Sequence, residues 1–300
     1  MSKATVKKVR EATRKAGGAT LTKDNRSAAL NKFFAVMQSQ PINMQVKSFD
    51  TLKTKQVQRY VDYLKEKGLT TRSIHNNLGH IRQALRTVGR GHFADSEPMS
   101  NEALGVSGAS RDGTHRALTS KQYQAVLAAT RATNPGAACC MELQRELGLR
   151  EREAIQCVES LKSWLKALKS GLPSQILHGT KGGRPRWMAV LDKSRAIDAI
   201  ERAIEVSNAQ GGFLIIAKNL KAAARAYGRA CESVGLKGEY ASHCLRCTYA
   251  RDRYEIYMAL HGDRREALAA VSIDLGHGDG RGTYVAQVYL KNDPRESPLP

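Results

Sequence analysis

Residues 241–250 read ASHCLRCTYA, and two incompatible interpretations of this stretch lead to different folds and different chemistry. Cys244 and Cys247 have the two-residue gap that is typical of a metal or redox pair. His243 and Arg246 overlap with them as a His-x-x-Arg step. The rest of the sequence decides which pair matters.

The other cysteines argue against a metal centre or a disulfide framework. Six cysteines are diluted through 300 residues. A structural zinc site usually takes four ligands, often as two closely spaced pairs, and Cys139 and Cys140 are adjacent rather than gapped. Cys231 falls on an apolar helical stripe, which is the position of a small core residue. We therefore expect free thiols, no metal and no other cofactor.

The composition predicts a nucleic-acid partner. The chain has 48 Lys and Arg against 28 Asp and Glu, a formal charge of +20, and 41% hydrophobic residues. Such an excess favours a polyanionic partner, and nucleic acid ahead of an anionic membrane. No apolar run approaches the roughly 18 residues of a membrane span, and the N-terminal sequence lacks the apolar centre of a secretion signal. We expect a cytoplasmic protein without membrane contact.

The N-terminal third predicts a small helical domain. Residues 1–19 form a basic segment that we expect to be a flexible leader, and residues 20–100 a helical domain. Within it, Val57 to Leu64 and Ile74 to Leu85 repeat at helical spacing, with Gly68 as a stop between them. The exposed faces carry cations that we expect to contact DNA: Lys53, Lys55, Arg59, Arg72, Arg82 and Arg86.

A second domain is expected over residues 117–290, after a Gly- and Ser-rich linker at 101–116. A helix should begin behind Thr119 or Ser120, and others should cover 197–204 and 219–234. The segment SQILHGTKGGRPRWMAVL predicts two short strands around a cationic turn, in which Arg184 and Arg186 are further candidate DNA contacts. The fold class is therefore mainly α with a small β-sheet, and the proline-containing residues 291–300 form a tail.

Four segments of this domain contain polar residues that a plain helical domain does not need: ELGLREREAI (146–155), GTKGGRPRWMAV (179–190), ASHCLRCTYA and DLGHGDGRGTYVAQVYL (274–290). In this order they resemble the catalytic domain of the tyrosine recombinases, the phage-integrase family. The preceding helices resemble, more loosely, the SAM-like core-binding domain of that family. The resemblance assigns these positions to an active site: Arg150, Lys181, His243, Arg246, His277, the supporting acid Glu153 and the nucleophile Tyr289.

Elementary chemistry explains these residue types. Two guanidiniums, Arg150 and Arg246, would clamp the charged oxygens of a phosphodiester with fixed donors. A tyrosine hydroxyl needs a base, which suits His243. Lys181 would protonate the leaving 5′ oxygen, and His277 would add a hydrogen bond to the phosphate. The resemblance thus implies a 3′-phosphotyrosyl intermediate that forms without metal or ATP.

Three departures from the family pattern leave alternatives open, and one of them is the interval of 31 positions between Arg246 and His277 (277 − 246), which is longer than usual in the family. The interval between His277 and the final tyrosines is longer than usual in the family, so Tyr284 is an alternative nucleophile. Cys247 stands where the family commonly has histidine, which makes the Cys-x-x-Cys spacing a coincidence of substitution. A second His-x-x-Arg step at His261 shows that the bare spacing also arises by chance.

The resemblance implies a site-specific recombinase that acts on double-stranded DNA as a homo-tetramer on paired sites, from a phage or other mobile element, associated with a bacterial nucleoid. A type IB topoisomerase-like enzyme and a non-catalytic DNA-binding protein on the same scaffold are the alternatives. The target sequence does not follow from these residues, because base contacts depend on groove positions.

Overall fold

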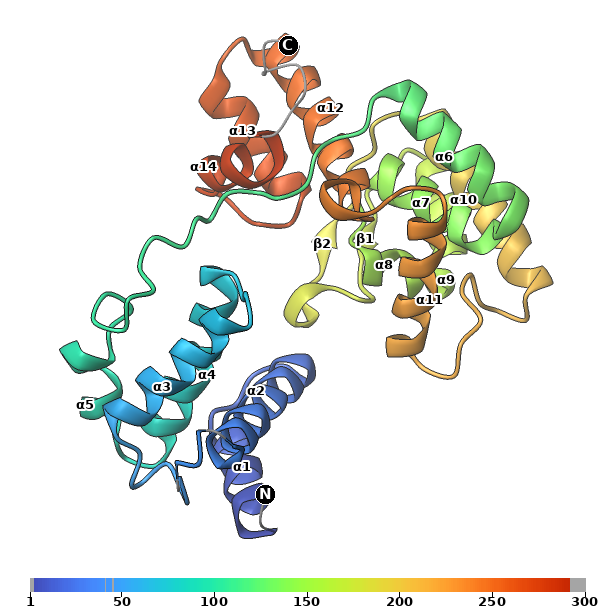
Figure 1. Ribbon diagram of the computed structural model, residues 1–300. Helices are drawn as coiled ribbons and strands as arrows, with labels where there is room; N and C mark the ends of the chain where they lie inside the picture. Colours follow the sequence, from blue (N-terminus) through green and yellow to red (C-terminus); the bar gives the residue numbers. More distant parts are fainter. Residues whose placement is uncertain (1–2, 41, 45, 292–300) are drawn as a thin grey trace. The chain divides into compact units, whose positions relative to one another are not determined.

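The computed structural model describes residues 3–40, 42–44 and 46–291, and the chain divides into two compact units at residues 110 and 111 (Figure 1). The unit formed by residues up to 110 is entirely helical in its described part. Its elements are α1 (Lys3–Lys15), α2 (Thr20–Gln38), α3 (Thr54–Glu66), α4 (Thr71–Thr87), α5 (Gly91–Ala94) and the 3-10 turn η1 (Glu97–Met99).

The core of this unit follows the predicted apolar spacing. Val57, Tyr60, Val61 and Leu64 of α3 are buried, and the side chain of Thr70 caps α4. Helices α2 and α3 meet through aromatic rings, because Phe33 packs edge-on against Tyr60 at 5.0 Å between centroids. The two expected helices around Gly68 are thus confirmed.

The expected flexible leader is wrong over its described residues. Residues Lys3–Lys15 form α1, which packs against α2 and α4. Val9 and Ala12 are buried in the core of the unit, and the Arg26 guanidinium donates to the carbonyl oxygens of Thr13 (3.3 Å) and Gly17 (3.0 Å). Apolar residues one helical turn apart between the lysines give α1 a face to bury.

The first unit also extends past residue 100. Leu104 and Val106 are buried in its core, so the first residues of the expected linker belong to a packed domain. The chain enters the second unit at Arg111. Of the expected tail at 291–300, only Lys291 lies among the described residues.

The second unit is mainly helical with one small sheet, as predicted. Its elements are α6 (Ser120–Thr133), α7 (Pro135–Leu147), α8 (Glu151–Ile155), α9 (Val158–Lys169), β1 (Gln175–Ile176), η2 (Lys181–Gly183), β2 (Arg186–Trp187), α10 (Lys193–Ala209), α11 (Leu220–Ser233), η3 (Gly238–Tyr240), α12 (Cys244–His261), α13 (Arg264–Asp274), α14 (Gly282–Val285) and the π-helix η4 (Ala286–Leu290). The strands pair antiparallel, with Gln175 opposite Trp187.

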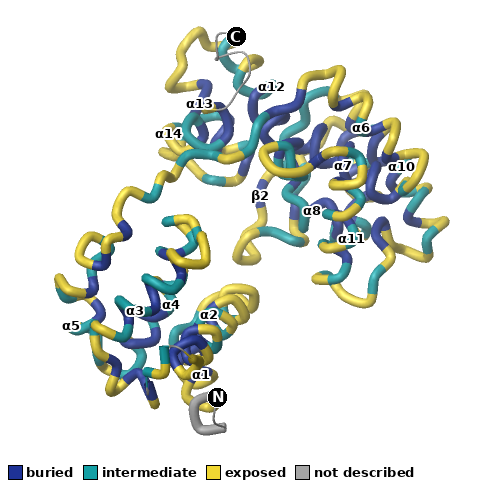
Figure 2. The backbone as a smooth tube through the Cα atoms, in the orientation of Figure 1, coloured by how far each residue is buried: buried dark blue, intermediate teal, exposed yellow. Residues whose placement is uncertain are grey.

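Helix α7 is the centre of this unit. Every residue from Gly136 to Leu147 is buried, and α6, α10 and α12 pack around the helix (Figure 2). The Thr119 side chain caps α6 at its predicted start. None of the helices in the described part of the chain combines the length and the apolar character needed to cross a membrane.

Candidate active site

A tight turn after α7 places Arg150. Gly148 ends the helix with φ 58°, and a Cβ atom there would lie 2.5 Å from the ring of Tyr249, so only glycine fits. Arg150 then begins α8. Its backbone N–H donates to Oε2 of Glu153 (2.8 Å), and its guanidinium donates to Oε1 of the same carboxylate (2.6 Å). The predicted Arg-x-x-Glu step is therefore one hydrogen-bonded unit.

Glu153 is fully buried beneath the site. Burial alone would raise the pKa of this carboxyl, but the guanidiniums of Arg186, Arg246 and Arg150 lower it to about 2. The carboxylate is therefore charged at neutral pH, and it accepts a hydrogen bond from Arg186 at 2.8 Å. One acid holds several arginines of the site in place.

The expectation that Arg186 contacts DNA is wrong. Its guanidinium is buried, and besides Glu153 it donates to the carbonyl oxygens of Gly148 (2.9 Å) and Asp274 (2.9 Å). Four of the five N–H groups of Arg186 are thereby used within the protein, by the carboxylate and the two carbonyls, which leaves too few donors to clamp a phosphate. Arg186 supports the site from below, whereas Arg184 on the same hairpin is exposed.

Arg246 lies in the first turn of α12 and is fully buried. Its guanidinium donates to the carbonyl oxygens of Gly148 and Leu275, and its Nε lies 3.4 Å from the Tyr289 hydroxyl. Arg150 also donates to the Leu275 carbonyl, at 3.1 Å. The shared carbonyl acceptor of Leu275 thus holds the two predicted clamp arginines side by side.

Tyr289 points into this arginine cluster, and Tyr284 lies at its edge. The Tyr289 side chain is only 4% exposed, and its hydroxyl lies 3.0 Å from Nε2 of His277. Tyr284 is 38% exposed, and its ring stacks edge-on against His277 at 4.9 Å. Burial, and then the proximity of Tyr289, raises the pKa of Tyr284. The contacts of its hydroxyl with His277 and Arg246 favour Tyr289 over Tyr284 as the candidate nucleophile.

His243 also lies next to Tyr289. Its ring lies 5.6 Å from the Tyr289 ring and 5.3 Å from the ring of His115. Burial and the charge of Arg246, with smaller effects from neighbouring groups, lower the pKa of His243 to about 3, and the same two causes lower that of His277 to about 3. Both imidazoles are neutral at pH 7, so each offers one acceptor nitrogen.

Lys181 lies where the sequence predicts it, in the turn η2 between β1 and β2, and its side chain is exposed. Its charge contributes to the lowered pKa of His277, which places it in the electrostatic neighbourhood of the site. The alternative step at His261 lies elsewhere, at the end of α12, where His261 stacks on Tyr257 at 5.8 Å.

Cys244 and Cys247 are core residues. Both are fully buried, and they face different apolar clusters of the unit. Burial raises the pKa of Cys247 to about 12 and that of Cys244 further. Across residues 3–40, 42–44 and 46–291, no group of three or more His, Cys, Asp or Glu side chains could hold a metal ion. Because both side chains are buried among apolar residues, they contribute to the packing of the core.

The cations expected on the first unit differ in whether the unit already supplies them with a partner. Lys53, Lys55 and Arg72 are exposed, and Arg72 donates to the carbonyl oxygen of Ser110. Three others have partners within the unit: Arg59 pairs with Glu66 at 2.8 Å, Arg86 pairs with Asp95, and Arg82 donates to Met99 and Asn101. Their assignment to DNA stays a prediction.

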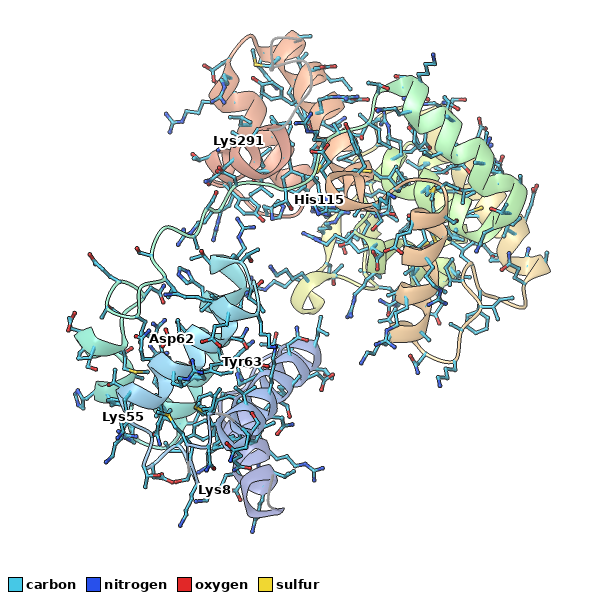
Figure 3. All side chains as sticks on the ribbon, in the orientation of Figure 1. Lys8, Lys55, Asp62, Tyr63, His115 and Lys291 are labelled. Carbon is cyan, nitrogen blue, oxygen red and sulfur yellow. The ribbon has the colours of Figure 1, made fainter. Side chains whose placement is uncertain are left out.

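Two features escaped the sequence analysis. A row of exposed cations follows one face of α11 and lines a shallow hollow of about 360 Å³: Lys218, Lys221, Arg225 and Arg229. Their spacing of three to four residues was the available signal. His115, labelled in Figure 3, contacts His243 from the segment that precedes α6, and no local pattern marks it.

Comparisons with known proteins concern the fold and the family of the chain. No curated protein sequence matches the chain. Among solved structures, the Tn1549 transposon integrase in complex with a circular intermediate DNA is 15% identical, with 97% of each chain covered and a TM-score of 0.61. A lambda integrase tetramer bound to a Holliday junction is 16% identical, with 93% of this chain and 75% of that chain covered and a TM-score of 0.57. These likenesses show the fold.

Two family models match the chain along most of its length. The model described as "Phage integrase, N-terminal" matches residues 1–94, and the model described as "Integrase" matches residues 105–252. The second match contains Arg150, Lys181, His243 and Arg246. The chain belongs to the tyrosine recombinase family, the phage integrases.

Proposed function

We propose that this protein is a site-specific DNA recombinase that cleaves and rejoins duplex DNA through a 3′-phosphotyrosyl intermediate on Tyr289. The observation that carries the proposal is the position of the Tyr289 hydroxyl, 3.0 Å from Nε2 of His277 and 3.4 Å from Nε of Arg246. A nucleophile, a base and a phosphate clamp thereby meet at one point.

The arginines supply the electrostatic part of the reaction. A guanidinium has five N–H groups, and Arg246 uses three of them in its bonds to Gly148, Leu275 and Tyr289. The other two, with the N–H groups of Arg150, serve the phosphate oxygens on which charge develops in the transition state. Glu153 holds Arg150, and the carbonyl oxygens of Gly148 and Leu275 hold Arg246, before the substrate arrives, so little reorganisation is needed.

The geometry favours His277 over His243 as the acceptor of the tyrosine proton, which differs from the roles that the resemblance implies. In the free protein burial, and then the charges of Arg246 and Arg150, lower the pKa of His277. The charge of a bound phosphodiester offsets these arginines and raises the imidazole pKa. His277 therefore becomes an effective base when DNA is in place, and His243 donates to a phosphate oxygen.

The reaction balances within these groups. The Tyr289 oxygen attacks phosphorus as its proton passes to His277, a P–O bond to tyrosine forms, and the bond to the 5′ oxygen breaks. Lys181 delivers a proton to that oxygen. The reverse steps rejoin either the original strand or a new one, because the phosphotyrosyl bond keeps the energy of the broken bond.

The cationic surface supports double-stranded DNA as the substrate. The charge of +20, the exposed Lys53 and Lys55, and the row on α11 suit a phosphate backbone. The lambda integrase relative is a tetramer on a Holliday junction. By analogy we propose a homo-tetramer on paired sites, with two strand exchanges through a four-way junction, in a protein of a phage or other mobile element.

Trapping on DNA tests the proposal. A pool of nicked duplexes of random sequence prevents rejoining, and the protein should form covalent adducts that survive denaturation. Tyr289→Phe should abolish the adducts and keep DNA affinity, whereas Tyr284→Phe should still form them. Sequencing the trapped duplexes yields the target site.

The alternatives give different results. Duplex binding without any adduct would indicate a non-catalytic binder. Relaxation of supercoiled DNA by a monomer, without junction intermediates, would indicate a topoisomerase. Adducts that survive in Tyr289→Phe and vanish in Tyr284→Phe would move the nucleophile.

A further inference from the structure

The first residues of the second unit lie along the chain segment that carries Tyr289. We call residues 112–116 the strap; in Figure 1 this connection passes α14 on its way to α6. The backbone N–H of Gly113 donates to the carbonyl oxygen of Gln287 (3.0 Å), and the Gln287 side chain donates to Oδ1 of Asp112 (3.0 Å). Lys291 forms an ion pair with Asp112. The strap therefore holds both sides of Tyr289.

Gly113 makes this contact possible. A Cβ atom at position 113 would lie 1.9 Å from the carbonyl oxygen of Val288 and 2.7 Å from its carbonyl carbon. Both are backbone atoms, so the clash could not be relieved by the movement of a side chain. Only a glycine lets the strap lie directly against the residue that precedes Tyr289.

The other end of the strap is fixed to the loop before His243. The Arg116 backbone N–H donates to the Glu239 carbonyl oxygen (2.9 Å), and the two side chains form an ion pair at 2.9 Å. Between the two ends, the His115 ring lies against that of His243 at 5.3 Å. The strap thus touches both the nucleophile segment and a histidine of the site.

The nucleophile segment needs such support. Helix α14 has four residues and the π-helix η4 has five. Helices this short do not hold their conformation alone, so their position depends on tertiary contacts. Among these contacts, the strap bonds directly to the backbone of the segment on the N-terminal side of Tyr289.

We propose that the strap is a positioning element for the nucleophile: Asp112 and Gly113 dock the Tyr289 segment in the active site of its own chain. This inference rests on the proposed function, because it assumes Tyr289 as the nucleophile. A displacement of about 1 Å in a reacting group costs on the order of 100-fold in rate, so loss of the contact acts on the chemical step. It removes no cation and leaves DNA affinity intact.

The full-length Gly113→Ala variant tests the strap, with a nicked duplex recovered from the trapped pool as the probe. We expect the adduct rate at saturating DNA to fall about 100-fold, with the half-saturating DNA concentration unchanged. Gly228→Ala is the matched control, because a Cβ there meets nothing within 4 Å, and it should cleave at the wild-type rate.

A second pair of variants covers the case in which Gly113→Ala fails to fold. Asp112→Asn keeps an acceptor for Gln287 and should cleave nearly normally, whereas Asp112→Leu removes it and should lose about tenfold or more. Cleavage at the wild-type rate by Gly113→Ala or Asp112→Leu would contradict a positioning role for the strap. A loss of cleavage that is explained by weaker DNA binding would contradict it as well. If the wild type itself forms no adduct, the proposed function fails instead.

Discussion

The hydroxyl of Tyr289 lies 3.0 Å from Nε2 of His277, twelve residues earlier in the chain. The glycine-rich interval between them folds into a turn and the short helix α14, which brings the tyrosine back over the histidine. The long interval between His277 and the final tyrosines had made Tyr284 an alternative nucleophile. The turn and α14 take up its extra residues, so that Tyr289 still reaches His277. Tyr284 instead packs its ring against the same histidine.

The pH dependence of stability tests the charge state of the histidines. The pKa of His243 is about 3 in the folded protein, against about 6.5 in an unfolded chain. Between these values the unfolded chain binds a proton that the folded protein does not, so the free energy of unfolding falls as the pH falls through this window.

We therefore expect the melting temperature of the wild type to drop from about pH 7.5 to about pH 5, and to drop less in His243→Gln. His92→Gln, an exposed substitution on α5, should keep the wild-type drop. Equal drops in all three proteins would show that His243 is not held neutral by its surroundings.

Glu153→Gln tests the carboxylate that holds the arginines. The change removes a buried charge that pairs with Arg150 and Arg186, and it points an amide N–H₂ group at guanidiniums. Breaking a buried pair typically costs about 3–5 kcal/mol of unfolding free energy, and the misplaced arginines should slow adduct formation.

Chemical denaturation and trapping on nicked DNA measure the two effects. The matched control is Glu201→Gln, which removes an exposed ion pair with Lys169 and should cost at most about 1 kcal/mol. If Glu153→Gln lowered the free energy of unfolding and the rate of adduct formation no more than Glu201→Gln, the Glu153 carboxylate would not organise the site.

The order of the site residues was predictable because each lies in a short local pattern. The Arg-x-x-Glu step at Arg150, the His-x-x-Arg step at His243 and the residues around His277 each occupy a few positions, and helix spacing marked α3, α4, α6, α10 and α11. Such patterns depend only on residues that are close together along the chain, so they can be found in the sequence.

The roles of Arg186 and His115 could not be predicted in this way. Arg186 meets Glu153 across 33 residues, and whether a cation in a basic hairpin faces DNA or a buried acid depends on how that hairpin packs. His115 contacts His243 only because the strap is bound, through Arg116, to the residues that precede His243. The roles of Arg186 and His115 both depend on tertiary contacts between segments whose sequences do not indicate that they meet.

The salt dependence of DNA binding tests the cationic row on α11. Each phosphate contact contributes about 0.9 to the slope of log affinity against log salt concentration. Arg225→Ala should therefore lower that slope by about one and weaken binding to all duplexes similarly. Lys169→Ala is the control, because Glu201 already neutralises this lysine. An unchanged slope in Arg225→Ala would exclude α11 from the DNA interface.

Thiol reactivity tests the conclusion that Cys244 and Cys247 are packing residues. All six cysteines are buried, and burial raises the pKa of Cys157 and Cys247 to about 12. Because the thiolate is the reactive species, a thiol reagent should react slowly with the native protein and rapidly with all six thiols in denaturant. Ser194→Cys, at an exposed position of α10, supplies a fast thiol as a positive control.

A chelator completes this test. Since both thiols of the Cys-x-x-Cys step pack into apolar clusters, we expect adduct formation on nicked DNA to continue unchanged in EDTA. Cys247→Ala should also form the adduct, because no step of the proposed mechanism uses this thiol, which packs in the same apolar cluster as Tyr289. Two fast thiols in the native protein together with loss of cleavage in EDTA would restore the metal interpretation of ASHCLRCTYA, because accessible thiolates and a removable ion are what such a site requires.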